Sequence, residues 1–323
     1  MTADQAPKTN VHVRNQHPGQ DNSRTELLEG LLRADKSISP KYFYDARGSL
    51  LFEQITQLPE YYPTRTERQI LSRYATHMHK ACGSDCVLIE PGSGSSEKVR
   101  LLLEDLRPSA YLALDISAEF LRQAAERLGS DYPWLQVFAI CTDFGLDWSV
   151  PEDLPAGRRI VFYPGSTLGN LEPEAALGFL TAMRGWMKDS GGALVGLDMH
   201  KDSTRLNAAY NDSQGVTAAF NRNILNHVNT LLGANFIPEN FRHHAFYNEE
   251  KQRIEMHLLA QGAQRVDLGG PVIECADGES IHTEHSYKYT VEQFSELCSA
   301  AGLRLRQRWS DPEDLFSVFY LTP

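Results

Sequence analysis

Short apolar runs alternate with helix-length segments between residues 86 and 199, and this alternation limits the possible folds more than any other feature. The runs are "CVLIE", "YLALDI", "WLQVFAIC", "RIVFYPG" and "GALVGLDM". Strands with nearly continuous apolar side chains are typical of a parallel sheet that is covered by helices on both faces. The sequence therefore predicts an α/β fold with a Rossmann-like sheet.

The first apolar run leads into a glycine-rich turn, "LIEPGSGSSEK", at residues 88–98. A turn of this kind between a strand and a helix typically holds a nucleotide-like ligand. A phosphate-binding P-loop would need Ser or Thr after its lysine, but Val99 follows Lys98 here. A dinucleotide-binding loop carries a third glycine, and Glu97 stands in its place. Neither phosphate-binding loop fits this sequence.

The remaining ligand is S-adenosylmethionine (SAM), which has no phosphate and carries a positive sulfonium and an α-amino group. Glu90, two residues before the first glycine, suits this cation. Asp115 ends the next strand, where it can accept hydrogen bonds from both ribose hydroxyls. Asp143 and Phe144 follow the third strand, where they can bind the adenine amino group and pack on its ring. Acids after three successive strands favour a SAM-dependent methyltransferase. The alternative is that Asp115 and Asp143 only cap the helices that follow them.

Charge and composition exclude several other functions. A net charge of −11 argues against a nucleic-acid partner, which would require a basic surface. The sequence has no apolar run of about 18 residues that could span a membrane. The polar residues 1–24 lack the apolar core of a signal peptide, and we expect a flexible tail. Five scattered cysteines indicate reduced thiols in the cytoplasm, and their spacing predicts no metal site.

The strand–helix alternation ends near Lys201, after which two helical segments and several strand-like stretches follow. The last three elements read as a helix and two strands that can extend the earlier sheet. We therefore predict a methyltransferase domain formed by residues 65–200 and 287–323. Residues 25–64 and 201–286 are predicted to form a second, α+β domain that binds the substrate.

Several motifs resemble the histidine Nα-methyltransferases of ergothioneine biosynthesis. They are "KYFYDARGSLLFEQITQLPEYYPTRTE", "EPGSGSSEK", "YPGSTLGNLEP", "AYNDSQGVTAAFNRN", "QRIEM" and "TEHSYKY". The resemblance runs from about residue 25 to the C-terminus. It implies a SAM-dependent methyltransferase domain joined to a domain that holds the amino acid. It also implies three methyl transfers to the α-amine of free L-histidine, which give the betaine hercynine.

The same resemblance implies site residues, position by position. The cofactor contacts implied are Gly92, Lys98, Asp115, Asp143 and Phe144. The histidine contacts implied are Tyr61, Asn170, Tyr210, Glu284 and Ser286, with Tyr44 and Met256 close by.

Each of these residues has an expected role. Asn170 and a tyrosine oxygen align the amine, and Tyr44 assists the departure of its proton. Tyr210 donates to the carboxylate, while Glu284 and Ser286 bind the two imidazole nitrogens. We expect a monomer that uses neither a metal nor a membrane.

Two departures from the family pattern leave alternatives open. They are Pro91 and the segment "YPGSTLGN". The chain could methylate an imidazole nitrogen or another amino acid. It could also be a SAM- or amino-acid-binding module without catalytic activity.

Overall fold

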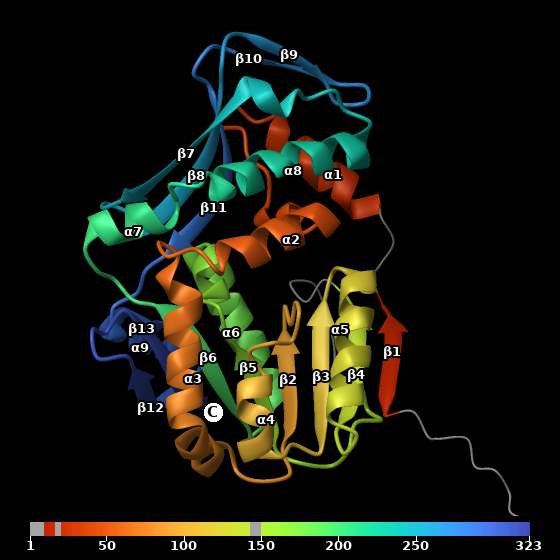
Figure 1. Cartoon of the computed structure of the whole chain (residues 1–323), viewed down its shortest axis with the longest axis vertical. Coiled ribbons are helices and arrows are strands. Elements are labelled where there is room, and N and C mark those ends of the chain that lie inside the picture. Colours follow the sequence, from red (N-terminus) through yellow and green to blue (C-terminus); the bar gives the residue numbers. More distant parts are fainter. Residues whose placement is uncertain (1–9, 17–20, 143–149) are drawn as a thin grey trace, which may run out of the picture.

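An eight-stranded sheet forms one half of the molecule (Figure 1). The computed structural model describes residues 10–16, 21–142 and 150–323. The first six strands in spatial order are parallel, and the last two run antiparallel to their neighbours. In spatial order the strands are β1 (Val11–Asn15), β4 (Gln136–Cys141), β3 (Ala110–Asp115), β2 (Val87–Pro91), β5 (Arg159–Tyr163), β6 (Gly192–Asp198), β13 (Phe316–Thr322) and β12 (Arg304–Ser310).

Helices cover both faces of this sheet, which explains why its central strands are apolar throughout. Every residue of β2 and of β6 is buried. Two separate hydrophobic cores lie against the two faces. One contains side chains of α3 (Tyr62–Cys82), α4 (Arg100–Leu106) and α5 (Ala118–Asp131). The other contains side chains of α6 (Pro173–Met187) and α9 (Val291–Ala300).

The order of the strands reverses at β2, and this reversal positions the ligand site. From β2 the chain moves to one side through β3 and β4, and then to the other side through β5 and β6. In open α/β sheets, ligands bind beyond the carboxyl ends of the strands at such a switch point. The glycine-rich turn directly follows β2. In Figure 1 the arrowheads of β2 and β3 point toward the rest of the molecule, where α2 lies.

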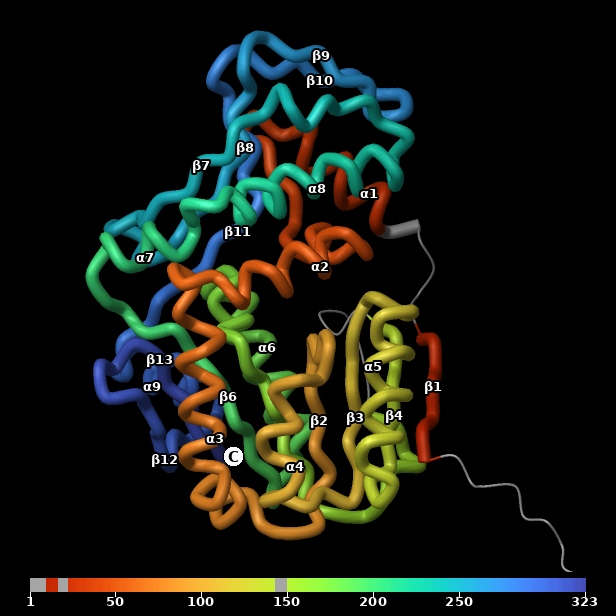
Figure 2. Tube along the Cα trace, in the orientation of Figure 1, coloured from red at the N-terminus to blue at the C-terminus, as the bar shows by residue number. Residues whose placement is uncertain are grey.

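Residues 21–62 and 203–287 form the other half, which we call the second lobe. Its three-stranded antiparallel sheet has the order β11-β8-β7, and β9 and β10 form a separate hairpin. Figure 2 shows the N-terminal segment running beside α8, although the two are far apart in sequence. The elements are α1 (Asp21–Leu31), η1 (Pro40–Phe43), α2 (Ala46–Ile55), α7 (Ser203–Ala209), α8 (Val216–Leu232), η3 (Pro238–Asn240), β7 (Phe241–Asn248), β8 (Arg253–Ala260), β9 (Gln264–Asp267), β10 (Val272–Cys275) and β11 (Ser280–Tyr287).

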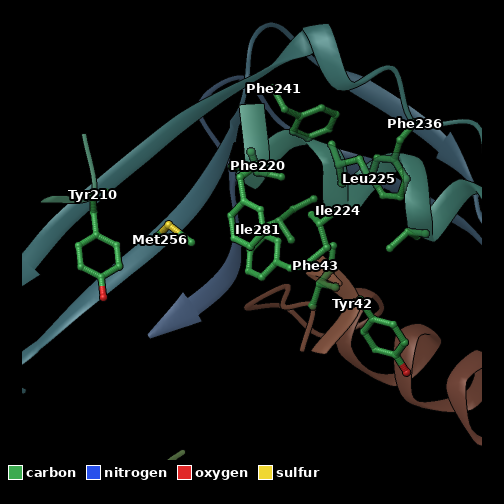
Figure 3. Close-up of a cluster of buried hydrophobic side chains, with 14 of the residues drawn as sticks. Tyr42, Phe43, Tyr210, Phe220, Ile224, Leu225, Phe236, Phe241, Met256 and Ile281 are labelled. Carbon is green, nitrogen blue, oxygen red and sulfur yellow. The ribbon is translucent and has the colours of Figure 1, made fainter. Parts of the chain in front are cut away.

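A third hydrophobic core joins the two sequence segments of the second lobe. Phe43, from the N-terminal segment, stacks on Phe220 of α8 with ring centroids 4.5 Å apart. Tyr210 and Met256 lie at one end of this core, and the hydroxyl of Tyr210 points away from it (Figure 3). The core therefore presents polar groups at one edge while its interior stays apolar.

The expected flexible tail at residues 1–24 is wrong in part. Val11–Asn15 forms edge strand β1, which pairs in parallel with β4 over five residues. The side-chain amide of Asn10 donates to the carbonyls of Gly129 at 3.0 Å and Leu135 at 2.9 Å. A polar segment can pair here because the pairing uses backbone hydrogen bonds, and no residue of this edge strand is fully buried.

All five cysteines are free and buried. In the described part of the chain, no helix combines the length and apolar character needed to cross a membrane.

Candidate active site

The glycine turn after β2 is tied to the end of β3 by Asp115. Gly92 and Gly94 have φ angles of +69° and +51°, a backbone conformation that glycine adopts readily. The backbone N–H of Gly94 donates to one oxygen of Asp115 at 2.9 Å, and the N–H of Ser117 donates to the other at 3.0 Å. Because each carboxylate oxygen has two lone pairs, each can still accept one further hydrogen bond. Asp115 is thus suited to a vicinal diol.

Glu90, the carboxylate expected to bind the SAM cation, lies buried in β2 directly before the turn. It is 2% exposed and accepts a hydrogen bond from Tyr111 at 2.5 Å. The hydroxyl of Tyr111 also contacts Ser96, at 3.1 Å. Burial raises the pKa of Glu90 to about 8, although Tyr111 and Lys98 oppose this shift. Glu90 therefore supports the glycine turn through Tyr111 and Ser96, in surroundings that favour its protonated, neutral form.

Lys98 forms an ion pair with Glu67, a residue that the sequence analysis does not single out. The Lys98 ammonium lies 2.6 Å from the Glu67 carboxylate, which is 1% exposed. Glu67 also accepts from the backbone N–H of Gly165, at 2.8 and 3.0 Å. Helix α3 thereby joins the glycine turn to the loop after β5. Asp143 and Phe144 lie outside the described residues.

Four residues implied by the resemblance line one small pocket in the second lobe. Tyr61, Tyr210, Met256 and Glu284 share it with Phe52, Ile55, Ala209, Thr217 and Phe220. The rings of Tyr61 and Tyr210 meet edge to face at 6.2 Å. Met256 on β8 is the direct cross-strand partner of Glu284 on β11. Carboxylate, phenol and thioether groups thus converge from four separate stretches of sequence.

Glu284 is a buried carboxylate at the edge of the apolar core. It is 8% exposed, and burial raises its pKa to about 7, with Lys288 acting in the opposite direction. Among the described residues, no hydrogen bond to the carboxylate of Glu284 is formed. A buried polar group without a partner is costly, so this carboxylate suits a ligand that brings an N–H donor.

Tyr44 lies between the pocket and the cofactor edge of the sheet. Its backbone carbonyl accepts a hydrogen bond from the hydroxyl of Ser117 at 3.0 Å, directly after the strand that carries Asp115. Burial raises the pKa of Tyr44, and the carboxylates of Glu284 and Asp115 add to the shift. Both acids therefore act on one phenol. This links the two halves of the candidate site.

Asn170 ends a short 3-10 helix, η2 (Thr167–Asn170), that packs against β11. A Cβ built on Gly169 would lie 3.5 Å from the hydroxyl of Ser286 and 2.7 Å from the carbonyl of Tyr287. Glycine therefore permits this close approach of the turn to the strand. Glu172, not Asn170, occupies the N-cap position of α6. The side chain of Asn170 is consequently not committed to capping that helix.

The structure adds residues that sequence reasoning missed. Thr217 and Phe220 line the pocket and lie within the quoted motif "GVTAAFNRN", so this motif could have identified them as pocket residues. Lys288 belongs to "TEHSYKY" and contacts both Ser286 and Tyr210. Asp198 is an acid at the end of an apolar strand, the same signal that identified Asp115. Phe52 also lies within a quoted motif, "KYFYDARGSLLFEQITQLPEYYPTRTE".

The doubly wound sheet, with a glycine turn at its switch point, belongs to the Rossmann-like SAM-dependent methyltransferases, as the sequence predicts. More narrowly, the chain belongs to the family of histidine-specific, SAM-dependent methyltransferases, which it matches over residues 23–323. The expected family resemblance is confirmed.

Two curated relatives agree with this assignment, and a third is named for a different substrate. The histidine N-alpha-methyltransferase of Mycolicibacterium smegmatis is 42% identical over 91% of this chain and 93% of its own length. The Mycobacterium tuberculosis protein of the same name is 40% identical, over 95% and 98%. The 4-dimethylallyltryptophan N-methyltransferase of Aspergillus fumigatus is 27% identical, over 89% and 90%.

Proposed function

We propose that this enzyme transfers three methyl groups from SAM to the α-amine of L-histidine, giving hercynine on the route to ergothioneine. Membership of the histidine-specific family supports the substrate. The observation that carries the proposal is the connection of two sites through Tyr44, whose carbonyl bonds to Ser117 while its phenol lies near Glu284 and Asp115. The proximity of the buried pocket to Asp115, through Tyr44, supports one reaction that uses both.

The proposed division of labour follows the hydrophobic cores. Residues 65–200 and 287–323 would bind SAM, and residues 25–64 and 201–286 would bind histidine. The two cores on the faces of the large sheet and the single core of the second lobe support this division. We further propose a monomer that acts in the cytoplasm, and the five free cysteines are consistent with a reducing compartment.

In the cofactor half, the chain's own residues would hold and orient SAM. Asp115 would accept from the two ribose hydroxyls through the lone pairs that Gly94 and Ser117 leave available. Gly92 would let the backbone approach the ligand, and Glu67 holds Lys98 near the turn. Asp143 and Phe144 would bind the adenine. When bound, SAM supplies an electrophilic methyl group on a sulfonium, and its thioether product leaves uncharged.

In the substrate half, the main task is to hold a neutral amine in line with the methyl carbon. Positioning of this kind contributes about 7–11 kcal/mol in ideal cases. The side-chain carbonyl of Asn170 and the oxygen of Tyr61 would accept hydrogen bonds from the amine and direct its lone pair. Because the pKa of Tyr44 is raised, its phenol stays protonated. Tyr44 would therefore relay a proton rather than act as a phenolate base.

The remaining residues would recognise the rest of histidine. Tyr210 would donate its hydroxyl to the carboxylate, and its orientation away from the core supports this role (Figure 3). Glu284 would accept from one imidazole N–H, Ser286 would bond the other ring nitrogen, and Met256 would limit the ring size. A buried carboxylate that accepts no hydrogen bond from the described residues, opposite a flexible thioether, supports a pocket for a small ring with an N–H donor.

Fragmentation of the product by mass spectrometry tests the proposed function. Purified protein is incubated with SAM and L-histidine, and the product is fragmented. We expect the addition of three methyl groups and loss of neutral trimethylamine, since a quaternary α-amine leaves readily. A product that keeps its primary amine would assign the methylation to the ring. Absence of S-adenosylhomocysteine would indicate a binding module instead of an enzyme.

A further inference from the structure

Lys288 is a fully buried lysine directly after β11, and its ammonium has three oxygen neighbours. The amine nitrogen lies 2.7 Å from the hydroxyl of Ser286, 3.0 Å from a carboxylate oxygen of Asp198 and 3.3 Å from the hydroxyl of Tyr210. Only 1% of its side chain is exposed. Two of its three neighbours are residues proposed above to bind histidine. Lys288 therefore adjoins the pocket without belonging to its lining.

Asp198, at the end of β6, keeps this ammonium charged. Burial lowers the pKa of Lys288, but the charge of Asp198 and the neighbouring Tyr210 raise it above its ordinary value overall. Asp198 is itself 1% exposed and also pairs with Lys201 and accepts from Tyr62 at 2.8 Å. The ion pair thus connects the large sheet to the second lobe, and it fixes the position of the Lys288 ammonium.

A charged ammonium has three N–H donors and no acceptor. The hydroxyl oxygens of Ser286 and Tyr210 must therefore accept hydrogen bonds from Lys288. Each hydroxyl is left with its own proton, which has to point in another direction. A hydrogen bond from the Ser286 hydroxyl also lowers the pKa of the Tyr210 phenol, so the Ser286 proton can point to the Tyr210 oxygen or to a ligand. Each oxygen keeps one further lone pair, but accepting from a cation makes each hydroxyl a stronger donor and a weaker acceptor.

We propose that Lys288 is a positioning residue that favours Ser286 and Tyr210 as hydrogen-bond donors toward the substrate. The inference rests on the proposed function and refines it. Ser286 then favours a ring nitrogen without a proton, while the carboxylate of Glu284 needs one that carries a proton. Tyr210 donates to the substrate carboxylate. Together these polarities select histidine with a neutral imidazole in a single tautomer, and they disfavour rings that lack either nitrogen.

Lys201 provides a matched control for Lys288. Both lysines pair with Asp198, at 2.5 and 3.0 Å, and both are largely buried. Lys201 bonds to Asp198 and to the carbonyl of Met199. Among the described residues, its ammonium makes no hydrogen bond to Ser286 or Tyr210. Replacing either lysine removes one cation from Asp198, and only Lys288→Met also removes the donor to the two hydroxyls.

The first experiment compares L-histidine with an analogue whose ring is pyrrole, which keeps an N–H but has no bare nitrogen. The ratio of kcat/KM for the two substrates is measured in the parent, Lys288→Met, Lys201→Met and Ser286→Ala. We expect the ratio to fall by roughly fivefold to tenfold in Lys288→Met and in Ser286→Ala, about the value of one hydrogen bond. Lys201→Met should keep the parent ratio. A ratio unchanged in Lys288→Met would overturn the inference.

The second experiment needs no variant, so it remains informative if Lys288→Met does not fold. Histidine labelled with nitrogen-15 in the ring is bound to the parent protein together with S-adenosylhomocysteine, and its ring nitrogen shifts are recorded. We expect one protonated and one bare nitrogen. An imidazolium or an equal mixture of tautomers would contradict the proposal. If the parent does not methylate histidine, the proposed function fails, and that result is separate from both readouts.

Discussion

At the residue scale, the candidate site depends on carboxylates whose surroundings differ. Asp115 accepts two backbone hydrogen bonds, Glu90 is bonded to a tyrosine, and Glu284 has no hydrogen bond among the described residues. Burial raises the pKa of all three. Their partners indicate their roles. Asp115 fixes the glycine turn and keeps lone pairs available, and Glu90 supports the same turn. Glu284 is available to accept a hydrogen bond from a ligand.

Asp115→Ala should weaken SAM binding about tenfold or more. The change removes a charged acceptor from the ribose, and hydrogen bonds to charged groups contribute about 1.5–3 kcal/mol each. Calorimetric titration with SAM measures the effect, and the exposed Asp189→Ala is the control. A folded Asp115→Ala protein that binds SAM as tightly as the parent would disprove this cofactor assignment.

Glu284→Ala should lower the affinity for histidine and reduce its advantage over larger aromatic amino acids. The ring N–H loses a charge-assisted hydrogen bond, which is roughly twice as strong as a neutral one. Met256→Val in the Glu284→Ala background should favour an indole or a phenol further, because the shorter side chain leaves more room opposite position 284. Turnover of histidine, tryptophan and phenylalanine is compared in the three proteins. An unchanged preference would exclude Glu284 as the residue that reads the imidazole.

Glu284 should also make the free protein less stable as the pH rises. Its pKa is about 7 in the folded chain and lower in the unfolded chain. Between these two values the folded state binds one more proton, so the free energy of unfolding falls with rising pH. The shift from 4.5 to about 7 corresponds to roughly 3 kcal/mol at most. The free energy of unfolding, measured with urea, should fall less between pH 5 and pH 8 in Glu284→Gln than in the parent. Equal falls in both proteins would refute the shift.

At the scale of elements, α3 connects the parts of the site. Tyr61 stands at its N-cap position beside the pocket, Tyr62 bonds to Asp198, and Glu67 holds Lys98 and Gly165. These contacts occur within two turns of one rigid helix. A shift of α3 would therefore change the amino-acid pocket and the cofactor turn together.

The parallel strands could be predicted from the sequence because helices bury both of their faces. The five runs quoted above correspond to β2, β3, β4, β5 and β6. Strand β1 could not be predicted in this way, since "VHVRN" is an edge strand with only partial burial. Strand β7 was missed for a similar reason: its histidines interrupt the apolar pattern, although the strand pairs with β8 along its whole length.

Removing residues 1–16 should lower the melting temperature by several degrees and leave SAM binding intact. The deletion removes the β1–β4 pairing and the Asn10 contacts, and it exposes the edge of β4. Strands β4 and β3 lie between β1 and β2, so β1 is far from the switch point. Calorimetric melting and a SAM titration test this together. An unchanged melting temperature would mean that β1 contributes no stability.

At the scale of the whole molecule, the site lies where two chain segments and two sheets meet. The cofactor turn follows the sequence order of a parallel sheet, so the position of Asp115 at the end of β3, beside the turn, could be predicted from the sequence. The pocket could not be assembled in the same way, because Tyr61, Tyr210 and Glu284 come together only through the fold of the second lobe. Their identification depended on motifs resembling a known family, and pairings such as Lys288 with Asp198 required the structure.

The central claim is that one pocket, joined to the cofactor edge, binds free L-histidine. Calorimetric titration of the full chain with a panel of free amino acids, with and without S-adenosylhomocysteine, tests it most directly. The account predicts that histidine binds more tightly than every other amino acid when S-adenosylhomocysteine is present, and that Glu284→Ala reduces this preference. Equal binding of several amino acids, or none by histidine in either condition, would contradict it.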